Sequence, residues 1–262
     1  MAEEDTDGQM GLSFIILADM EMPEPRKIMA AAHSMGIELA PAESNDDEPD
    51  KDGPDIQMFD LGDDAQLIVM LMPIPHPDVG EMMRGPFSPE DFDEIVAGPA
   101  HLVVSATRLS GTVDEQDIRM SALTTSVVEA CNPLAVLKMP GRIFHRPDLF
   151  ARAAREGVTD NEIPMLICVD VSVAQEDDGR YSFLTHNMER YGRENFYIFA
   201  RQDPGEAVDY ALSLIAWMLD DRTYHLPTGD TVGRTAGEKI VVQRVSNPTG
   251  EGEDVIKLEL PA

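Results

Sequence analysis

The sequence LSFIILA at residues 12–18 predicts a buried strand. A helix is expected over residues 23–35, because proline is favoured in a first helical turn and Gly36 suits the position after a helix. The acidic residues 1–11 are expected to be disordered. Segment 41–55, rich in acidic residues and proline, is expected to be a mobile loop because it has too little apolar surface to bury.

The next elements complete a pattern of strands and helices. Residues 56–61 and 66–72 are short apolar segments joined by a Gly-Asp-Asp turn, which predicts a hairpin. Ser88 precedes a proline and two acidic residues, a combination typical of a helix start, and residues 101–107 predict another strand. The resulting order of strand, helix, strand, strand, helix, strand is the ferredoxin-like pattern.

A second series of similar elements follows the first. Helices are expected over residues 114–131, 147–155 and 203–220, and strands over residues 134–138, 165–173, 181–188 and 195–200. Residues 239–245 and 254–260 are expected to form a closing hairpin. We therefore expect an α+β protein with mainly antiparallel sheets in two ferredoxin-like halves, residues 12–110 and 111–262, or the same elements in one continuous domain.

The composition is strongly acidic, with 49 Asp and Glu residues against 20 Lys and Arg residues and a formal net charge of -29. Such a charge repels nucleic acid and anionic membrane surfaces, so neither is an expected partner. It favours solubility, including in saline surroundings, and it attracts a basic protein. One segment, residues 138–156, is locally basic; pairing with acidic residues of the same chain and docking of an anion or acidic peptide are its two interpretations.

Other features place the protein in the cytoplasm. The first residues, MAEED, lack the basic region of a signal peptide, and the apolar run at residues 12–18 is too short to span a bilayer. The two cysteines, Cys131 and Cys168, lie far apart without a CxxC spacing. We expect them to be reduced core residues and not zinc ligands or a redox pair.

Four motifs occur in one order: MPIP at residues 72–75, AHLVVS at residues 100–105, THNMERYG at residues 185–192 and GDTVG at residues 229–233. This ordered set resembles a family of uncharacterised bacterial proteins that is defined only as a domain of unknown function. The resemblance extends over roughly residues 12–260 of the chain. It implies a cytoplasmic α+β protein and supplies no catalytic residue.

The chain departs from this family pattern at two places. Asn187 stands where glycine is expected, and Arg193, Glu194 and Asn195 replace a more acidic continuation of the block. These departures bear on any site built from the block and not on the fold.

Polar side chains concentrate in the last two motifs. The candidate binding residues are Thr185, His186, Glu189, Arg190, Tyr191 and Asp230. Strand alternation would separate His186 from Thr185 and place it among apolar side chains, where a hydrogen-bonded core histidine is the commoner outcome. Glu189, Tyr191 and Asp230 are therefore the first residues expected at a pocket.

Known catalytic patterns are missing from the sequence. The GDTVG turn has its glycines too close together for a phosphate-binding loop, and Asp230 would repel the phosphates, so a structural turn is expected. There is no GxSxG elbow and no HExxH motif. We expect no catalytic residues, no metal and no cofactor.

Three hypotheses for the function follow. The first is a non-enzymatic, cytoplasmic protein-binding module, with an acidic immunity-type neutraliser of a basic protein, such as a secreted toxin, as its specific form. The alternative is an enzyme or small-ligand binder with a polar pocket around Glu189, Tyr191 and Asp230. The third is a structural module of a larger assembly; since the chain has 16 methionines, it predicts an exposed methionine or apolar patch on a concave sheet face.

Overall fold

The computed structural model describes residues 10–42, 54–62, 64–72, 85–200, 204–221, 223–235, 237–250 and 252–260. The chain forms two compact units, Met1–Cys168 and Val169–Ala262. The expected disorder of residues 1–11, the expected loop at 41–55 and the MPIP turn lie largely outside the described residues.

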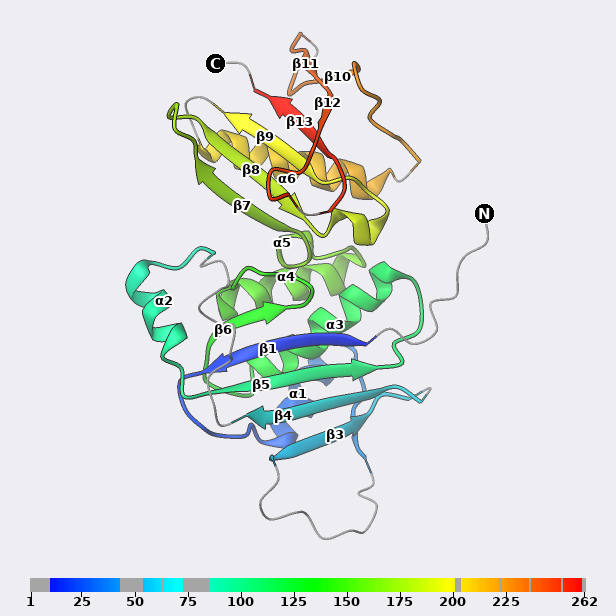
Figure 1. Ribbon diagram of the computed structural model, residues 1–262. Helices are drawn as coiled ribbons and strands as arrows, with labels where there is room; N and C mark the ends of the chain where they lie inside the picture. The colour runs from blue at the N-terminus through cyan, green and yellow to red at the C-terminus, as the bar shows by residue number, and fades with distance from the viewer. Residues whose placement is uncertain are drawn as a thin grey trace. The chain divides into compact units, whose positions relative to one another are not determined.

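The first unit is built on a six-stranded sheet (Figure 1). Across the sheet, the strands are β2 (Ala40–Pro41), β3 (Ile56–Asp60), β4 (Gln66–Met72), β5 (Ala100–Thr107), β1 (Gly11–Leu17) and β6 (Pro133–Lys138). All neighbouring strands are antiparallel. The predicted buried strand is thus present as β1, and it lies between β5 and β6.

The described part of this unit contains five helices: α1 (Pro25–Ser34), α2 (Pro89–Val96), α3 (Val113–Val128), α4 (Pro147–Asp160) and the short α5 (Met165–Cys168). Sequence signals set the start of α2 and the end of α1 as expected, whereas α4 continues to Asp160, beyond its expected end at residue 155. The Ser88 side chain accepts a hydrogen bond from the backbone N–H of Asp91 at 3.1 Å, which caps α2. Gly36 has a φ of 77°, a conformation that suits glycine after the end of α1.

Helices α1 and α3 lie on the same face of the sheet (Figure 1). On this face the hydroxyl of Ser13 in β1 is 3.0 Å from that of Thr124 in α3, and the Gln57 amide in β3 donates to the carbonyl of Pro23 at 2.8 Å. On the opposite face, α2 packs over β1 and β6 through a cluster that includes Ile16, Ile95 and Phe144.

Helix α3 is buried on several sides, and its buried side chains include polar ones. Its buried residues include Gln116, Asp117, Ser121, Thr124 and Thr125. Asp117 accepts a 2.6 Å hydrogen bond from the Lys138 ammonium at the end of β6, and the side chains of this ion pair are only 3% and 4% exposed. The pair ties α3 to the edge of the sheet.

The basic segment 138–156 pairs with acidic residues of its own unit. Besides Lys138, Arg146 bonds to Asp148 at 3.2 Å, and Arg155 forms an ion pair of 2.6 Å with Glu129. For these three cations the interpretation of internal pairing is confirmed.

The second unit contains a five-stranded sheet (Figure 1). Its strands, in order across the sheet, are β12 (Gln243–Val245), β13 (Val255–Glu259), β9 (Phe196–Ala200), β8 (Tyr181–His186) and β7 (Asp170–Gln175). Strands β7, β8, β9 and the pair β12–β13 are antiparallel, whereas β13 runs parallel to β9. Helix α6 (Pro204–Asp220) packs against β8 and β9, and β10 (Thr231–Val232) pairs with β11 (Ile240–Val241).

The α+β class with mainly antiparallel sheets is confirmed. The expected order of the first six elements is interrupted by the short strand β2, which lies between α1 and β3. The strand order in space has a feature that the sequence did not indicate: β5 and β6 are joined by α3, and β1 lies between them. Because β6 pairs with β1, the first unit extends to Cys168, whereas the sequence placed the boundary near residue 110. The strand expected over residues 165–173 is also different, since Pro164 is followed by α5 and β7 begins at Asp170.

No helix in the described ranges is long and apolar enough to cross a membrane.

Replacing Lys138 by methionine should destabilise the first unit by about 4 kcal/mol, because the carboxylate of Asp117 would remain buried without its cation. Urea unfolding followed by circular dichroism measures the change. The double variant K138M/D117L should recover most of the loss, since it removes both buried charges. A double variant as unstable as K138M would contradict this explanation.

His145 should make the first unit less stable in acid. Burial and, after it, the charge of Lys138 lower the pKa of His145 to about 4, below the value of about 6.5 for an unfolded histidine. Between these values the unfolded chain binds a proton that the folded protein does not, so the free energy of unfolding falls as the pH falls.

The matched variant is His145→Phe, which keeps a ring beside Phe150 (centroids 6.0 Å apart) and removes the titration. Relative to this variant, the unsubstituted protein should lose about 3 kcal/mol between neutral pH and about pH 4. Urea unfolding at a series of pH values measures the difference. Parallel curves for the two proteins would show that His145 does not titrate in this way.

Candidate binding groove in the second unit

The THNMERYG block supports the fold of the second unit. Thr185 is 1% exposed. Its hydroxyl donates to Asn195 Oδ1 at 3.2 Å and accepts from the backbone N–H of Phe196 at 2.7 Å. The amide of Asn195 donates to Glu189 Oε2 at 2.7 Å. Asn195 therefore links Thr185 and Glu189, and both of these candidate residues hold the turn between β8 and β9.

The other candidates in the block occupy different positions. His186 is half-buried, and its Nε2 lies 2.9 Å from the hydroxyl of Ser172 on β7. Arg190 is half-buried, whereas Tyr191 is only 4% exposed. The turn containing Arg190 and Tyr191 is the 3-10 helix η2 (Met188–Tyr191), with Asn187 and Gly192 in the left-handed conformation at its two ends.

The GDTVG segment forms a turn that is held by backbone hydrogen bonds. The backbone N–H of Asp230 donates to the carbonyl of Pro227 at 3.1 Å, and its carbonyl accepts from the N–H of Val242 at 2.8 Å. Asp230 is exposed. The residues directly after it, Thr231, Val232 and Gly233, form one wall of a groove.

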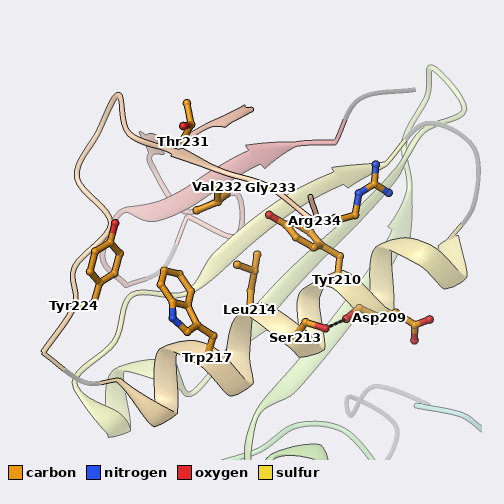
Figure 2. Close-up of a pocket in the computed structure, with 10 residues that line it drawn as sticks. All are labelled: Asp209, Tyr210, Ser213, Leu214, Trp217, Tyr224, Thr231, Val232, Gly233 and Arg234. Atoms are coloured by element: carbon orange, nitrogen blue, oxygen red, sulfur yellow. Dashed lines mark hydrogen bonds between the residues drawn. The ribbon is translucent and has the colours of Figure 1, made fainter. Parts of the chain in front are cut away.

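This groove has a volume of about 780 Å³ and lies between α6 and the chain from residue 224 to 234 (Figure 2). Helix α6 contributes Asp209, Tyr210, Ser213, Leu214 and Trp217, which share one side of the helix because they are three or four positions apart. The opposite wall consists of Tyr224, Thr231, Val232, Gly233 and Arg234. The described lining residues include none of the six candidates predicted from the sequence.

Two aromatic side chains lie together at one end of the groove. Trp217 and Tyr224 are 39% and 40% exposed, and their ring centroids are 5.1 Å apart with an interplanar angle of 45°. Figure 2 shows Tyr224 facing Trp217 across the groove, with Leu214 and Val232 beyond them. Trp217 is the only tryptophan of the chain. Exposed aromatic pairs of this kind offer a large contact area at a small cost in side-chain entropy.

Tyr210 lies toward the other end, near Arg234 (Figure 2). It is 7% exposed, and its buried hydroxyl has no hydrogen-bond partner among the described residues. Burial, and next the carboxylate of Glu238, raise the pKa of Tyr210 to about 12, while Arg234 opposes this shift. The phenol is therefore neutral at physiological pH.

Arg193 fixes the end of α6 that carries Trp217. The residue is 4% exposed, and its guanidinium donates to the carbonyls of Met218 and Tyr224, each at 2.8 Å, and to that of Asp221. The last carbonyls of a helix have no partners within the helix, and one planar guanidinium satisfies several of them at once. Arg193 thereby holds the backbone on which Trp217 and Tyr224 are mounted.

Arg244 anchors the next part of the same wall. Its guanidinium forms two hydrogen bonds of 2.7 Å with Glu194, and it also donates to the carbonyl of Leu226 at 2.9 Å and the hydroxyl of Thr228 at 2.8 Å. The Glu194 carboxylate raises the pKa of Arg244. Together, Arg193 and Arg244 fix the loop that connects α6 to the GDTVG turn.

Arg234 is engaged by Glu238 at the far end of the groove. The guanidinium Nη2 lies 2.6 Å from Glu238 Oε1, and the backbone N–H of Arg234 donates to Oε2 at 2.6 Å. These bonds from Arg234 lower the pKa of Glu238. The cation at this end is thus neutralised, whereas Asp209, at the same end, is exposed.

Sequence reasoning missed Arg193 and the aromatic residues of α6. Arg193 was noticed only as a departure from the family pattern. The available signal was Trp217 itself, a single tryptophan at helical spacing from Tyr210 and Leu214. The partner wall could not be found in this way, because it comes from a separate segment of the chain.

The groove has an apolar and aromatic floor with hydroxyl and carboxylate groups along it, which suits binding of an apolar or cationic group. Within the described ranges, no group of three or more His, Cys, Asp and Glu residues is placed to hold a metal ion. Neither a protein-family model, nor a curated protein, nor a solved structure matches the chain.

Replacing Arg193 by methionine should destabilise the second unit by about 3 kcal/mol, because buried carbonyls lose a charged donor. Urea unfolding followed by the fluorescence of Trp217 reports on this unit alone, since Trp217 is the only tryptophan. The control is Arg152→Met, an exposed arginine of the first unit, which should leave the transition unchanged. Equal midpoints for the two variants would show that Arg193 does not hold the end of α6.

Proposed function

We propose that the protein is a non-enzymatic protein-binding module, and that the groove of the second unit receives a basic segment of its partner. The observation that carries the proposal is the exposed pair of Trp217 and Tyr224 at the end of the groove. Tryptophan and tyrosine are the residues most often found at the energetic centre of protein interfaces. Their ring faces also attract lysine and arginine.

The charge of the protein supports a basic partner. Asp209 lines the groove, and Asp220 and Asp221 are exposed at the end of α6, close in sequence to Trp217 and Tyr224. A net charge of -29 would steer a cationic protein toward this acidic surface and raise the association rate at low salt. A basic toxin kept inactive by an acidic neutraliser is one such partner, in line with the cytoplasmic, immunity-type role expected from the sequence.

An enzyme or small-ligand binder remains the second candidate. For that function the groove is a better site than the set Glu189, Tyr191 and Asp230. The volume of the groove lies in the range of about 300–1,000 Å³ that is typical of small-molecule sites. The unpartnered hydroxyl of Tyr210 would add a hydrogen bond to a ligand with a polar group. Glu189, by contrast, already bonds to Asn195, and Tyr191 is buried.

Binding of lysine- and arginine-rich peptides should therefore be salt-sensitive and depend on the aromatic pair. Calorimetric titration of a peptide panel should show Trp217→Ala and Tyr224→Ala each weakening binding about tenfold or more, which corresponds to about 1.4 kcal/mol. The control Val173→Ala, at a residue of the same unit that is 53% exposed, should bind normally.

Two outcomes would contradict the proposal. The first is a panel in which no peptide binds in a salt-sensitive manner. The second is equal binding by the control and the two aromatic variants, which would indicate general attraction to the acidic surface instead of recognition in the groove.

A further inference from the structure

A second apolar surface lies in the first unit, on the face of the sheet away from α1 and α3. Along β3, Ile56 and Met58 are 51% and 42% exposed, although both are large and apolar. They stand opposite Met70 and Ile68 of β4, and both of these residues are half-buried. Met70 in turn stands opposite Val103 of β5, also half-buried. We call Ile56, Met58, Ile68, Met70 and Val103 the methionine face.

The strands are apolar on both sides, so this surface is not a polar, solvent-facing side of the sheet. The alternating residues Leu67, Val69 and Leu71 of β4 point to the other face and are at most 7% exposed. Figure 1 shows α1 and α3 behind the sheet and no labelled helix in front of β3 and β4. Helix α2 covers the sheet only near β1 and β6. Among the described elements, the methionine face is therefore without a covering helix.

Its composition favours a partner helix. Methionine side chains are flexible and polarisable, and they are enriched on surfaces that accept amphipathic helices of varied sequence. A contiguous apolar patch is also the usual mark of an interaction site on a protein surface. An extended strand is a poorer candidate, because the outer strand β2 has only two residues and one of them is Pro41, which has no N–H to donate.

The charged residues around the methionine face favour a basic helix as the partner. Asp55, Asp60 and Asp64 are exposed at the two ends of the β3–β4 hairpin. Asp60 and Asp64 also line a pocket of about 650 Å³ with Gln66, Thr107 and a single cation, Arg108. A second copy of the chain, with the same carboxylates and a net charge of -29, would be repelled.

We propose that the methionine face binds a basic amphipathic helix of a partner protein. The apolar side of that helix lies across Met58 and Met70, and its lysine or arginine residues reach the carboxylates at the ends of the hairpin. This surface belongs to the first unit and does not rest on the groove proposed above.

The test uses the full chain with methyl-labelled methionine and an amphipathic peptide of leucine and lysine as the probe. NMR spectra should show shifts of the Met58 and Met70 methyl signals, assigned by substitution with leucine. The variants Ile56→Lys and Met58→Lys should each weaken binding about tenfold, because a charge replaces apolar contact area. Val173→Lys, a matched addition of charge at an exposed residue of the second unit, should have no effect. Thermal unfolding confirms that each variant is folded.

Several results would overturn the inference. A peptide that changes the fluorescence of Trp217 and leaves the methionine signals unchanged would show that it binds in the groove and not at the methionine face. Binding of a peptide in which glutamate replaces lysine would show that the carboxylates do not select a basic helix. Broadening of the methionine signals with protein concentration, without peptide, would show that a second copy is the occupant. If the groove variants lose peptide binding and the variants of the methionine face do not, this inference is contradicted and the proposed function still stands.

Discussion

The buried guanidinium of Arg193 is the interaction on which the groove of the second unit depends. A charged group that is 4% exposed is stable only if hydrogen bonds replace its hydration, and carbonyls at the end of α6 and in the following loop provide them. The same bonds end the helix and position Tyr224 beside Trp217. A single side chain thus completes the helix and presents the aromatic pair. The THNMERYG block is connected to the groove indirectly, because it builds the turn from which Arg193 projects.

The first unit uses a buried charge in a comparable way. Helix α3 carries several polar residues into the interior, and the pair between Asp117 and Lys138 secures it to β6 at the edge of the sheet. Such a pair contributes little net stability compared with apolar residues of the same size. Its effect is on arrangement, because the buried contact between the Asp117 carboxylate and the Lys138 ammonium joins α3 to β6. The inclusion of β6 in the first unit, next to β1, agrees with this constraint.

The acidity of the chain connects the two proposed surfaces. Both combine apolar side chains with exposed carboxylates: Trp217 and Tyr224 are close in sequence to Asp220 and Asp221, and Met58 and Met70 belong to the hairpin that carries Asp60 and Asp64. Apolar area supplies affinity, while the charge supplies selection and a fast encounter with cationic partners. Several arginines that might have provided anion sites, including Arg155, Arg234 and Arg244, are instead engaged with glutamates of their own unit. The described surface is therefore better suited to a basic protein than to an anion.

The sequence by itself determined the elements: apolar runs gave the strands, Ser88 and Gly36 marked helix ends, and these local signals act between neighbours in the chain. It also indicated the α+β class and the turn at the GDTVG segment. The tertiary structure alone decided that β1 lies between β5 and β6, that the first unit extends to Cys168, and that β13 runs parallel to β9. It likewise decided the site, since Trp217, Tyr224 and Val232 meet only because Arg193 and Arg244 fix the loop between them. The physical reason is that strand order and groove walls depend on packing between distant segments, which no local pattern encodes.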